Sequence, residues 1–173
     1  VSRGLGDVYK RQFHIPRRLA RTVRKQPYQV TINRDFPTVI DECAALHDRR
    51  PETWINRDIR QLYVALHQLG FAHSVEVWND DRLVGGLYGV ALRSAFFGES
   101  MFSRQTDASK IALVHLVARL RAGGFSLLDA QFTNQHLMQF GIYEIDREKF
   151  QMRLADALTR SADLHLEKDS QPM

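Results

Sequence analysis

Two apolar runs joined by a short polar turn place the strongest constraint on how this chain can fold. The runs are HSVEVW (73–78) and LVGGLYGVAL (83–92), and the residues NDDR (79–82) separate them. Strand-forming residues on both sides of a short turn predict a β-hairpin. The remaining strands and helices must therefore be arranged around an antiparallel pair.

Strand and helix patterns alternate along the rest of the chain. Further strands are predicted over residues 28–33, 94–102, 125–132 and 143–145. Helices are predicted over residues 17–25, 36–47, 56–70, 107–124, 134–141 and 146–160. Apolar residues recur in these helices at helical spacing, as at Leu113, Leu116, Val117 and Leu120, and at Ile59, Leu62, Tyr63 and Leu66. The order predicts an α/β (α+β) fold, in which a mixed sheet is flanked by helices on both faces.

The order of elements resembles the acyltransferase fold of the Gcn5-related N-acetyltransferases. Those enzymes carry a loop of the form Q/R-x-x-G-x-G/A before a helix, whereas this chain has SRQTDAS (103–109) at that place. The resemblance therefore implies the fold without the coenzyme A cradle. A coenzyme-A-dependent N-acetyltransferase stays open as an alternative function.

Basic residues are concentrated in one predicted helix. The 173-residue chain has a net charge of only +4, yet seven basic residues and no acid lie between Lys10 and Lys25. On a helix, five of them fall within an arc of about 120°, namely Arg17, Arg18, Arg21, Arg24 and Lys25. Clustered cations are typical of proteins that bind the phosphate backbone of nucleic acids. The alternative is an ordinary solvated helix face.

Cysteine, histidine and hydropathy patterns exclude several classes of protein. Cys43 is the single cysteine, so an internal disulfide or a CxxC zinc site cannot form. The histidines lack the spacing of metal ligands, and no apolar run reaches the roughly 18 residues of a membrane span. We therefore expect a cytoplasmic domain that uses neither a metal nor a membrane.

Several longer blocks resemble one enzyme family. HSVEVW, LVGGLYGV, FFGESMFS, ASKIAL and DAQFTNQH follow in the order and spacing of the leucyl/phenylalanyl-tRNA–protein transferases, and ETWI and HIPRRLARTVRKQPYQVT match upstream. The resemblance covers residues 13 to 155. It implies transfer of Leu or Phe from aminoacyl-tRNA (Leu-tRNA, Phe-tRNA) to acceptor proteins with an N-terminal Arg or Lys. In bacteria this transfer marks the acceptor for degradation by the N-degron pathway.

The resemblance also implies a division of the chain. Residues 13–160 correspond to the C-terminal catalytic domain with its acyltransferase fold, residues 1–12 are interpreted as a non-native junction, and residues 161–173 as a polar tail. The family has a smaller N-terminal domain with a Trp-rich and Pro-rich segment that helps hold the terminal adenosine. Because that segment does not precede Phe13, we expect a truncated fragment, and an inactive tRNA-binding fragment stays open as an alternative.

Polar residues in two strands are the candidate catalytic groups. Asp129 and Gln131 lie two apart in SLLDAQF (126–132), so both point to one face, and a buried carboxylate needs partners. The resemblance implies that Gln131 contacts the attacking amine, that Asp129 orients Gln131, and that Glu99 binds the acceptor's amine or cationic end. A hydrogen-bonded structural pair and a surface glutamate are the alternatives.

The resemblance assigns the remaining substrate contacts as well. The apolar pocket for the donor side chain matches Leu87, Phe96, Met101, Leu113 and Leu128. Trp54 matches a position that stacks on the terminal adenosine. No cofactor is implied, and we expect a monomer. The helix start in SRQTDASK (103–110) is either a phosphate site, with Arg104 and Lys110, or an ordinary terminus capped by Asp107.

Overall fold

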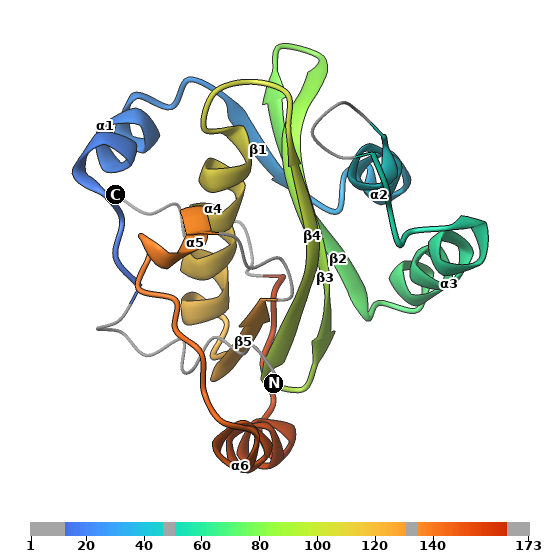
Figure 1. The fold of residues 1–173 in the computed structure, drawn as a ribbon, viewed down its shortest axis with the longest axis vertical. Helices are drawn as coiled ribbons and strands as arrows, with labels where there is room; N and C mark the ends of the chain where they lie inside the picture. The colour runs from blue at the N-terminus through green and yellow to red at the C-terminus, as the bar shows by residue number, and fades with distance from the viewer. Residues whose placement is uncertain (1–12, 47–50, 131–134, 166–173) are drawn as a thin grey trace.

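A computed structural model describes residues 13–46, 51–130 and 135–165 of the chain. In chain order its elements are α1 Arg17–Lys25, β1 Gln29–Ile32, α2 Phe36–Ala44, α3 Arg57–Gln68, β2 Ala72–Asn79, β3 Arg82–Leu92, β4 Ala95–Ser103, α4 Ala108–Ala122, β5 Leu127–Ala130, α5 Gln135–Met138 and α6 Arg147–Leu158. The prediction of a mixed sheet flanked by helices is confirmed (Figure 1).

The sheet has the strand order β1-β2-β3-β4-β5. The first three pairs are antiparallel, whereas β4 and β5 are parallel because α4 connects them. The predicted hairpin forms the β2–β3 pair, and Asp80 in its turn has a positive φ of 52°. The strand predicted over 143–145 is wrong. Residues 142–146 run without strand pairing, and Ile142 and Ile145 attach this segment to the protein by burial.

One face of the sheet is covered by α4, with α1 beside it (Figure 1). The helical spacing predicted for α4 is confirmed, since its four stripe residues are all buried: Leu113, Leu116, Val117 and Leu120. They pack against the odd-numbered β2 residues Val75 and Val77. Leu19 of α1 is 3% exposed and joins the same cluster.

The opposite face carries α2 and α3 (Figure 1). The Asp35 side chain caps α2 by accepting a hydrogen bond from the Thr38 amide at 3.2 Å, as expected for this residue type at a helix start. Burial of Phe36 and Ile40 then fixes α2 on the sheet. The predicted apolar face of α3 is partly wrong. Leu62 is 58% exposed, because α3 turns Ile59, Tyr63 and Leu66 toward the sheet instead.

The last helix, α6, lies at the end of the β4–β5 pair, where Ala157 packs with Ala95 and Leu127. Its predicted cap is confirmed, since the Asp146 carboxylate accepts from the Lys149 amide at 2.8 Å. Beyond α6 the chain returns to the core, where Leu164 is buried. In the part of the chain that the structure describes, no helix has the length and apolar content needed to cross a membrane.

Candidate active site

Two acids meet where β4 and β5 run side by side. Asp129 lies opposite Phe97 in the parallel ladder and is 2% exposed. Glu99, two residues further along β4, sits at a β-bulge and is half-buried. Leu128 and Ala130 point into the core beneath α4, so the alternation of the strand directs Asp129 to the other face. The two predicted carboxylates are therefore neighbours, whereas Gln131 lies outside the described residues.

The pKa of the Glu99 carboxyl is raised, and each cause is a named neighbour. Burial is the largest cause, a hydrogen bond with Tyr63 opposes the rise, and the negative charge of Asp129 adds to it. Tyr63 in turn has a raised pKa, caused by burial and then by Glu99. Two adjacent acids in a partly buried site favour the arrival of a cation, because a positive charge allows both to ionise.

Tyr63 was predicted only as a core residue of α3, and the structure gives it a contact with the site. Its ring packs edge-to-face on Tyr88, with centroids 5.2 Å apart, and on Trp54 at 6.2 Å. Trp54 itself is 49% exposed. The only signal for Tyr63 in the sequence was a polar-tipped aromatic within an apolar stripe.

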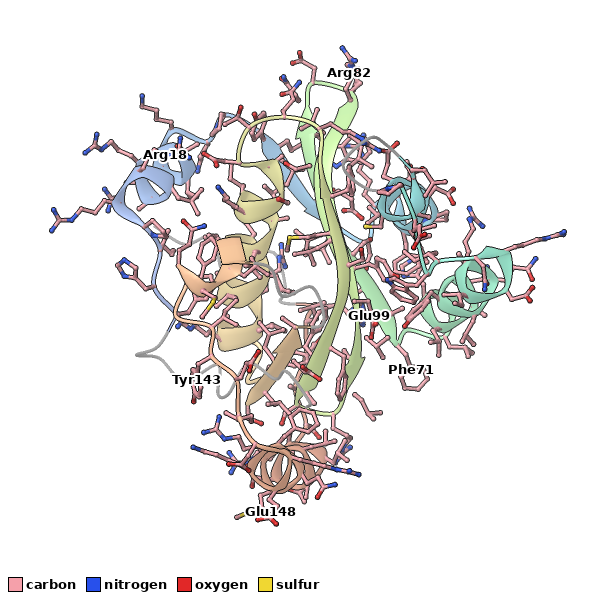
Figure 2. The ribbon with its side chains drawn as sticks, in the orientation of Figure 1. Arg18, Phe71, Arg82, Glu99, Tyr143 and Glu148 are labelled. Atoms are coloured by element: carbon pink, nitrogen blue, oxygen red, sulfur yellow. The ribbon has the colours of Figure 1, made fainter. Side chains whose placement is uncertain are left out.

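The five residues predicted to form the donor pocket come together. Leu87, Phe96, Leu113 and Leu128 are each at most 3% exposed and belong to the core under α4, and Met101 packs against them. This cluster lies on the face of the sheet opposite the Tyr63–Glu99 contact. Figure 2 shows Glu99 toward the α3 side of the sheet.

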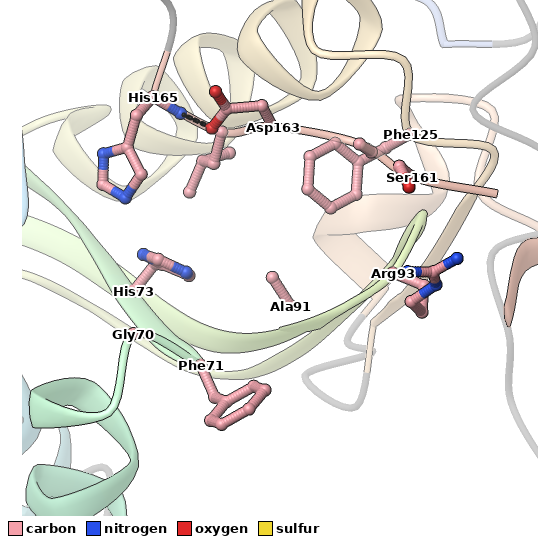
Figure 3. Close-up of a pocket in the computed structure, with 11 residues that line it drawn as sticks. Gly70, Phe71, His73, Ala91, Arg93, Phe125, Ser161, Asp163 and His165 are labelled. Atoms are coloured by element: carbon pink, nitrogen blue, oxygen red, sulfur yellow. Dashed lines mark hydrogen bonds between the residues drawn. The ribbon is translucent and has the colours of Figure 1, made fainter.

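A cavity of about 290 Å³ lies elsewhere, between the ends of β2 and β3 and the segment 161–165 (Figure 3). It is lined by His73, Arg93, Phe125, Asp163 and His165, together with smaller residues. None of the predicted site residues lines it. Burial, and then the neighbouring His165, lower the pKa of His73 to about 4, so its imidazole is neutral at ordinary pH.

The predicted basic helix forms, and its cations face solvent. All five predicted tRNA-binding residues of α1 are exposed: Arg17, Arg18, Arg21, Arg24 and Lys25. Leu19 and Val23 hold the opposite side of the helix on the core. Figure 2 shows Arg18 and Glu99 on opposite sides of the sheet. A nucleic acid that contacts both regions must therefore extend around the protein.

The start of α4 lacks the Asp107 cap that one alternative predicted. Asp107 does not cap the helix with its side chain; instead, the Ser103 hydroxyl accepts from the Ser109 amide at 3.3 Å. Arg104 is paired with Glu42 at 2.6 Å and Lys110 with Asp107 at 3.1 Å. Because both cations already have carboxylate partners, a phosphate bound here has to compete with Glu42 and Asp107 for them.

Most of the chain is similar to proteins of one known family. A family model described as "Leucyl/phenylalanyl-tRNA protein transferase" matches residues 8–155, beginning inside the segment interpreted as a junction. A relative of that name from Phenylobacterium zucineum is 63% identical over 153 residues, covering 88% of this chain and 69% of the relative. The corresponding protein of Hyphomonas neptunium is 61% identical over 153 residues, covering 88% and 59%.

A third relative of the same name, from Paramagnetospirillum magneticum, is 59% identical over 150 residues, covering 87% of this chain and 72% of the relative. The matched part thus spans between 59% and 72% of these relatives' lengths. Identity at this level over nearly the whole chain shows that the chain shares the fold and the family of these relatives. The chain belongs to the leucyl/phenylalanyl-tRNA–protein transferase family.

Proposed function

We propose that this protein transfers leucine or phenylalanine from aminoacyl-tRNA to acceptor proteins with an N-terminal Arg or Lys, in the cytoplasm and as a monomer. The observation that carries the proposal is the cluster of Asp129, Glu99 and Tyr63 beside the exposed ring of Trp54. An acidic pair next to an aromatic platform suits a cationic acceptor on one side and a nucleoside on the other.

Catalysis of this reaction depends mainly on positioning the two substrates and on charged groups beside them, because the aminoacyl ester is already activated. The acceptor's neutral α-amine attacks the carbonyl carbon of the aminoacyl ester, a new amide bond forms, and the bond to the ribose oxygen breaks. The proton lost by the amine is balanced by the proton that the ribose oxygen gains. Glu99 accepts hydrogen bonds from the acceptor's N-terminus, and its hydrogen bond with Tyr63 holds it in place. The neighbouring charge of Asp129 attracts the cationic side chain of the acceptor. Within this proposal Gln131 orients the amine.

The tRNA contacts divide between two regions of the protein. Trp54 stacks on the terminal adenosine, a contact worth roughly 1–3 kcal/mol per base. The exposed cations of α1 bind backbone phosphates. Within this proposal the donor side chain enters the apolar cluster under α4 past Met101, its partly buried member, which can adapt its shape. The ester then lies at β4, between that cluster and Glu99.

The direct test is transfer of labelled leucine from leucyl-tRNA to three peptides that differ only in their first residue: Arg, Lys or Ala. The proposal expects product with the Arg and Lys peptides and little with the Ala peptide. Acetyl-coenzyme A replaces leucyl-tRNA in a parallel reaction. Acetylation of the peptides there, without leucyl transfer, would make the protein an N-acetyltransferase instead.

Removal of cations from α1 is expected to weaken tRNA binding and to reduce its salt dependence. The triple substitution Arg17→Ala, Arg21→Ala, Arg24→Ala removes three exposed guanidinium groups. Each lost phosphate contact reduces the slope of log K against log salt by about 0.9 on duplex DNA and about 0.7 on single strands. Filter binding at several salt concentrations measures both quantities.

The matched control removes as many cations from α6 and the residues just after it, at the far end of the molecule (Figure 1). Arg147, Lys149 and Arg160 are exposed there, and their replacement by Ala keeps the same net charge as the α1 triple variant. If both variants lose the same salt slope, the effect is one of total charge, and α1 is not the binding surface.

A further inference from the structure

The loop between β4 and α4 holds a nearly buried acid beside the basic helix. The Asp107 side chain is only 5% exposed, and its Oδ1 accepts hydrogen bonds from Arg18 Nη2 at 3.3 Å and Lys110 Nζ at 3.1 Å. Its φ of 61° lies in the left-handed region, where few residues other than Gly, Asn and Asp are found. In this conformation the carboxylate lies between Arg18 of α1 and Lys110 of α4 and does not cap the backbone of α4.

A second contact joins the same loop to the other end of α1. The Tyr28 hydroxyl, three residues beyond the helix, donates to the carbonyl oxygen of Thr106 at 3.2 Å. Thr106 and Asp107 therefore hold the chain on both sides of α1, while Leu19 anchors the inner face of the helix. A helix of nine residues has little freedom to rotate once it is fixed at both ends and along one side.

Arg18 thus differs from the other cations of α1. Within the described residues, none of Arg17, Arg21, Arg24 and Lys25 has a salt bridge. Arg18 keeps most of its guanidinium in solvent, with the side chain 75% exposed, while one nitrogen contacts Asp107. One arginine fixes the helix, and the rest remain available to a polyanion.

The Asp107 loop is also the continuation of the strand that carries Glu99. β4 runs from Ala95 to Ser103, and α4 begins at Ala108. The connection from α1 to Glu99 therefore begins at the Arg18–Asp107 ion pair, which the Tyr28–Thr106 hydrogen bond reinforces. It continues through the four loop residues 104–107 and along β4, which is paired with β3 and β5. No other described side-chain hydrogen bond or ion pair joins α1 itself to the residues 95–122.

We propose that Asp107 is a positioning residue that sets where α1 stands relative to β4, so that phosphates bound on α1 place the aminoacyl ester beside Glu99. This inference rests on the proposed function. A positioning role predicts a different result for tRNA affinity and for the transfer rate, which a purely electrostatic role does not. An acid near a phosphate-binding surface opposes tRNA binding, so its removal leaves the affinity equal or tighter, yet it lowers transfer because the ester is misplaced.

The test compares Asp107→Gly with the wild-type chain. Glycine adopts the left-handed conformation without strain, so the substitution removes the carboxylate and keeps the backbone. At saturating leucyl-tRNA we expect the transfer rate to fall about 10- to 100-fold. The Kd for tRNA should be equal or lower, and the salt slope unchanged. Single-turnover transfer and filter binding measure the two effects.

Two further variants separate positioning from general stability. Asp107→Asn tolerates the same φ and keeps one oxygen that accepts from Arg18, so it should recover part of the transfer rate. Combining Arg18→Ala with Asp107→Gly should lower the rate no further than Asp107→Gly alone, because both remove the same ion pair. Asp156→Asn, which disrupts an exposed pair between Asp156 of α6 and Arg160 just beyond it, is the control and should match the wild type.

The possible outcomes are distinct. If Asp107→Gly lowers affinity and rate together, or leaves the rate unchanged while the wild-type chain transfers leucine, the positioning role is wrong and the proposed function stands. If the wild-type chain transfers no leucine to the Arg peptide, the proposed function fails and this inference falls with it. A lower rate with undiminished affinity and partial rescue by Asn supports it.

Discussion

Replacement of Asp129 by Asn is expected to lower the transfer rate about 100-fold at saturating tRNA and to leave the Kd for tRNA nearly unchanged. The substitution keeps the shape of a side chain that is 2% exposed but removes the negative charge beside Glu99. That charge helps attract the cationic Arg or Lys side chain of the acceptor. Single-turnover transfer and tRNA binding, measured on the same preparation, check the two expectations.

The pH dependence of the transfer rate should change in a definite direction in the same variant. The pKa of Glu99 is raised by burial and further by Asp129, so its ionised form appears only above the ordinary range for a glutamate. If transfer needs that form, the rate rises with pH through the raised pKa. Asp129→Asn removes one of the causes, so the acidic limb of the profile should move to lower pH. Glu99→Gln should remove this limb.

Glu148→Gln is the matched control, since Glu148 is an exposed acid on α6 (Figure 2). It should change neither the rate nor the profile. Two results would contradict the catalytic assignment of Asp129. One is an equal loss of affinity and rate, and the other is a loss of unfolding free energy large enough to explain the lower rate. Either would make Asp129 a residue of the fold.

The elements that could be predicted from the sequence are those with strong local signals. The hairpin has strand-forming residues around a polar turn, and α4 has an apolar stripe of four residues that are all buried in the structure. Both patterns depend only on neighbours in the chain. The face of α3 was less certain for the same reason. Its apolar residues cover a wide arc, so only packing on the sheet leaves Leu62 outside and turns Tyr63 inward.

The two acids of the site could be predicted from the sequence, whereas the residues that contact them could not. A carboxylate in an apolar strand is visible in the sequence, whereas the contact of Tyr63 with Glu99 joins α3 to β4 across 36 positions of sequence. Asp107 is similar. Its place before a helix predicts a cap, but the left-handed backbone turns it toward Arg18, 89 positions away. Contacts of this kind depend on the packing of whole elements.

Glu76 is the clearest case of a residue that only the fold explains, and its removal should cause the largest loss of stability. It lies inside the apolar run of β2 and is fully buried. Four donors satisfy its carboxylate: the Thr31 hydroxyl at 2.7 Å, the Ser74 hydroxyl at 2.5 Å, and the amides of Arg34 at 3.1 Å and Asp35 at 3.3 Å. Nothing in the periodicity of HSVEVW marks this acid.

These bonds fix the corner where β1 passes into α2. The Thr31 hydroxyl also accepts from Trp78 Nε1 at 2.8 Å. From this corner α2 places Phe36 edge-to-face against Tyr88, with centroids 5.7 Å apart. Tyr88 packs on Tyr63, the partner of Glu99. Glu76 thus supports the candidate site from the far end of an aromatic chain.

Glu76→Ala leaves one buried and three partly buried donors without their acceptor, and a fully buried group of this kind costs about 1–3 kcal/mol. Some of that cost is relieved by relaxation and water entry, so we expect the free energy of unfolding to fall by about 3–5 kcal/mol. Denaturant titration followed by tryptophan fluorescence measures the change, since Trp78 lies next to Glu76 on the same network. A loss of this size is a large part of the stability of an ordinary domain.

Glu76→Gln distinguishes the need for acceptors from the need for charge. The amide oxygen can accept from Ser74, Arg34 and Asp35, as Oε1 does now. Its NH₂ group then faces Thr31, whose hydroxyl must turn to accept instead of donate. One bond is reversed and none has to be lost, so the expected cost is only about 1–2 kcal/mol. If Gln and Ala lower stability equally, the buried negative charge itself holds the corner, and the count of hydrogen bonds does not explain why an acid stands in this strand.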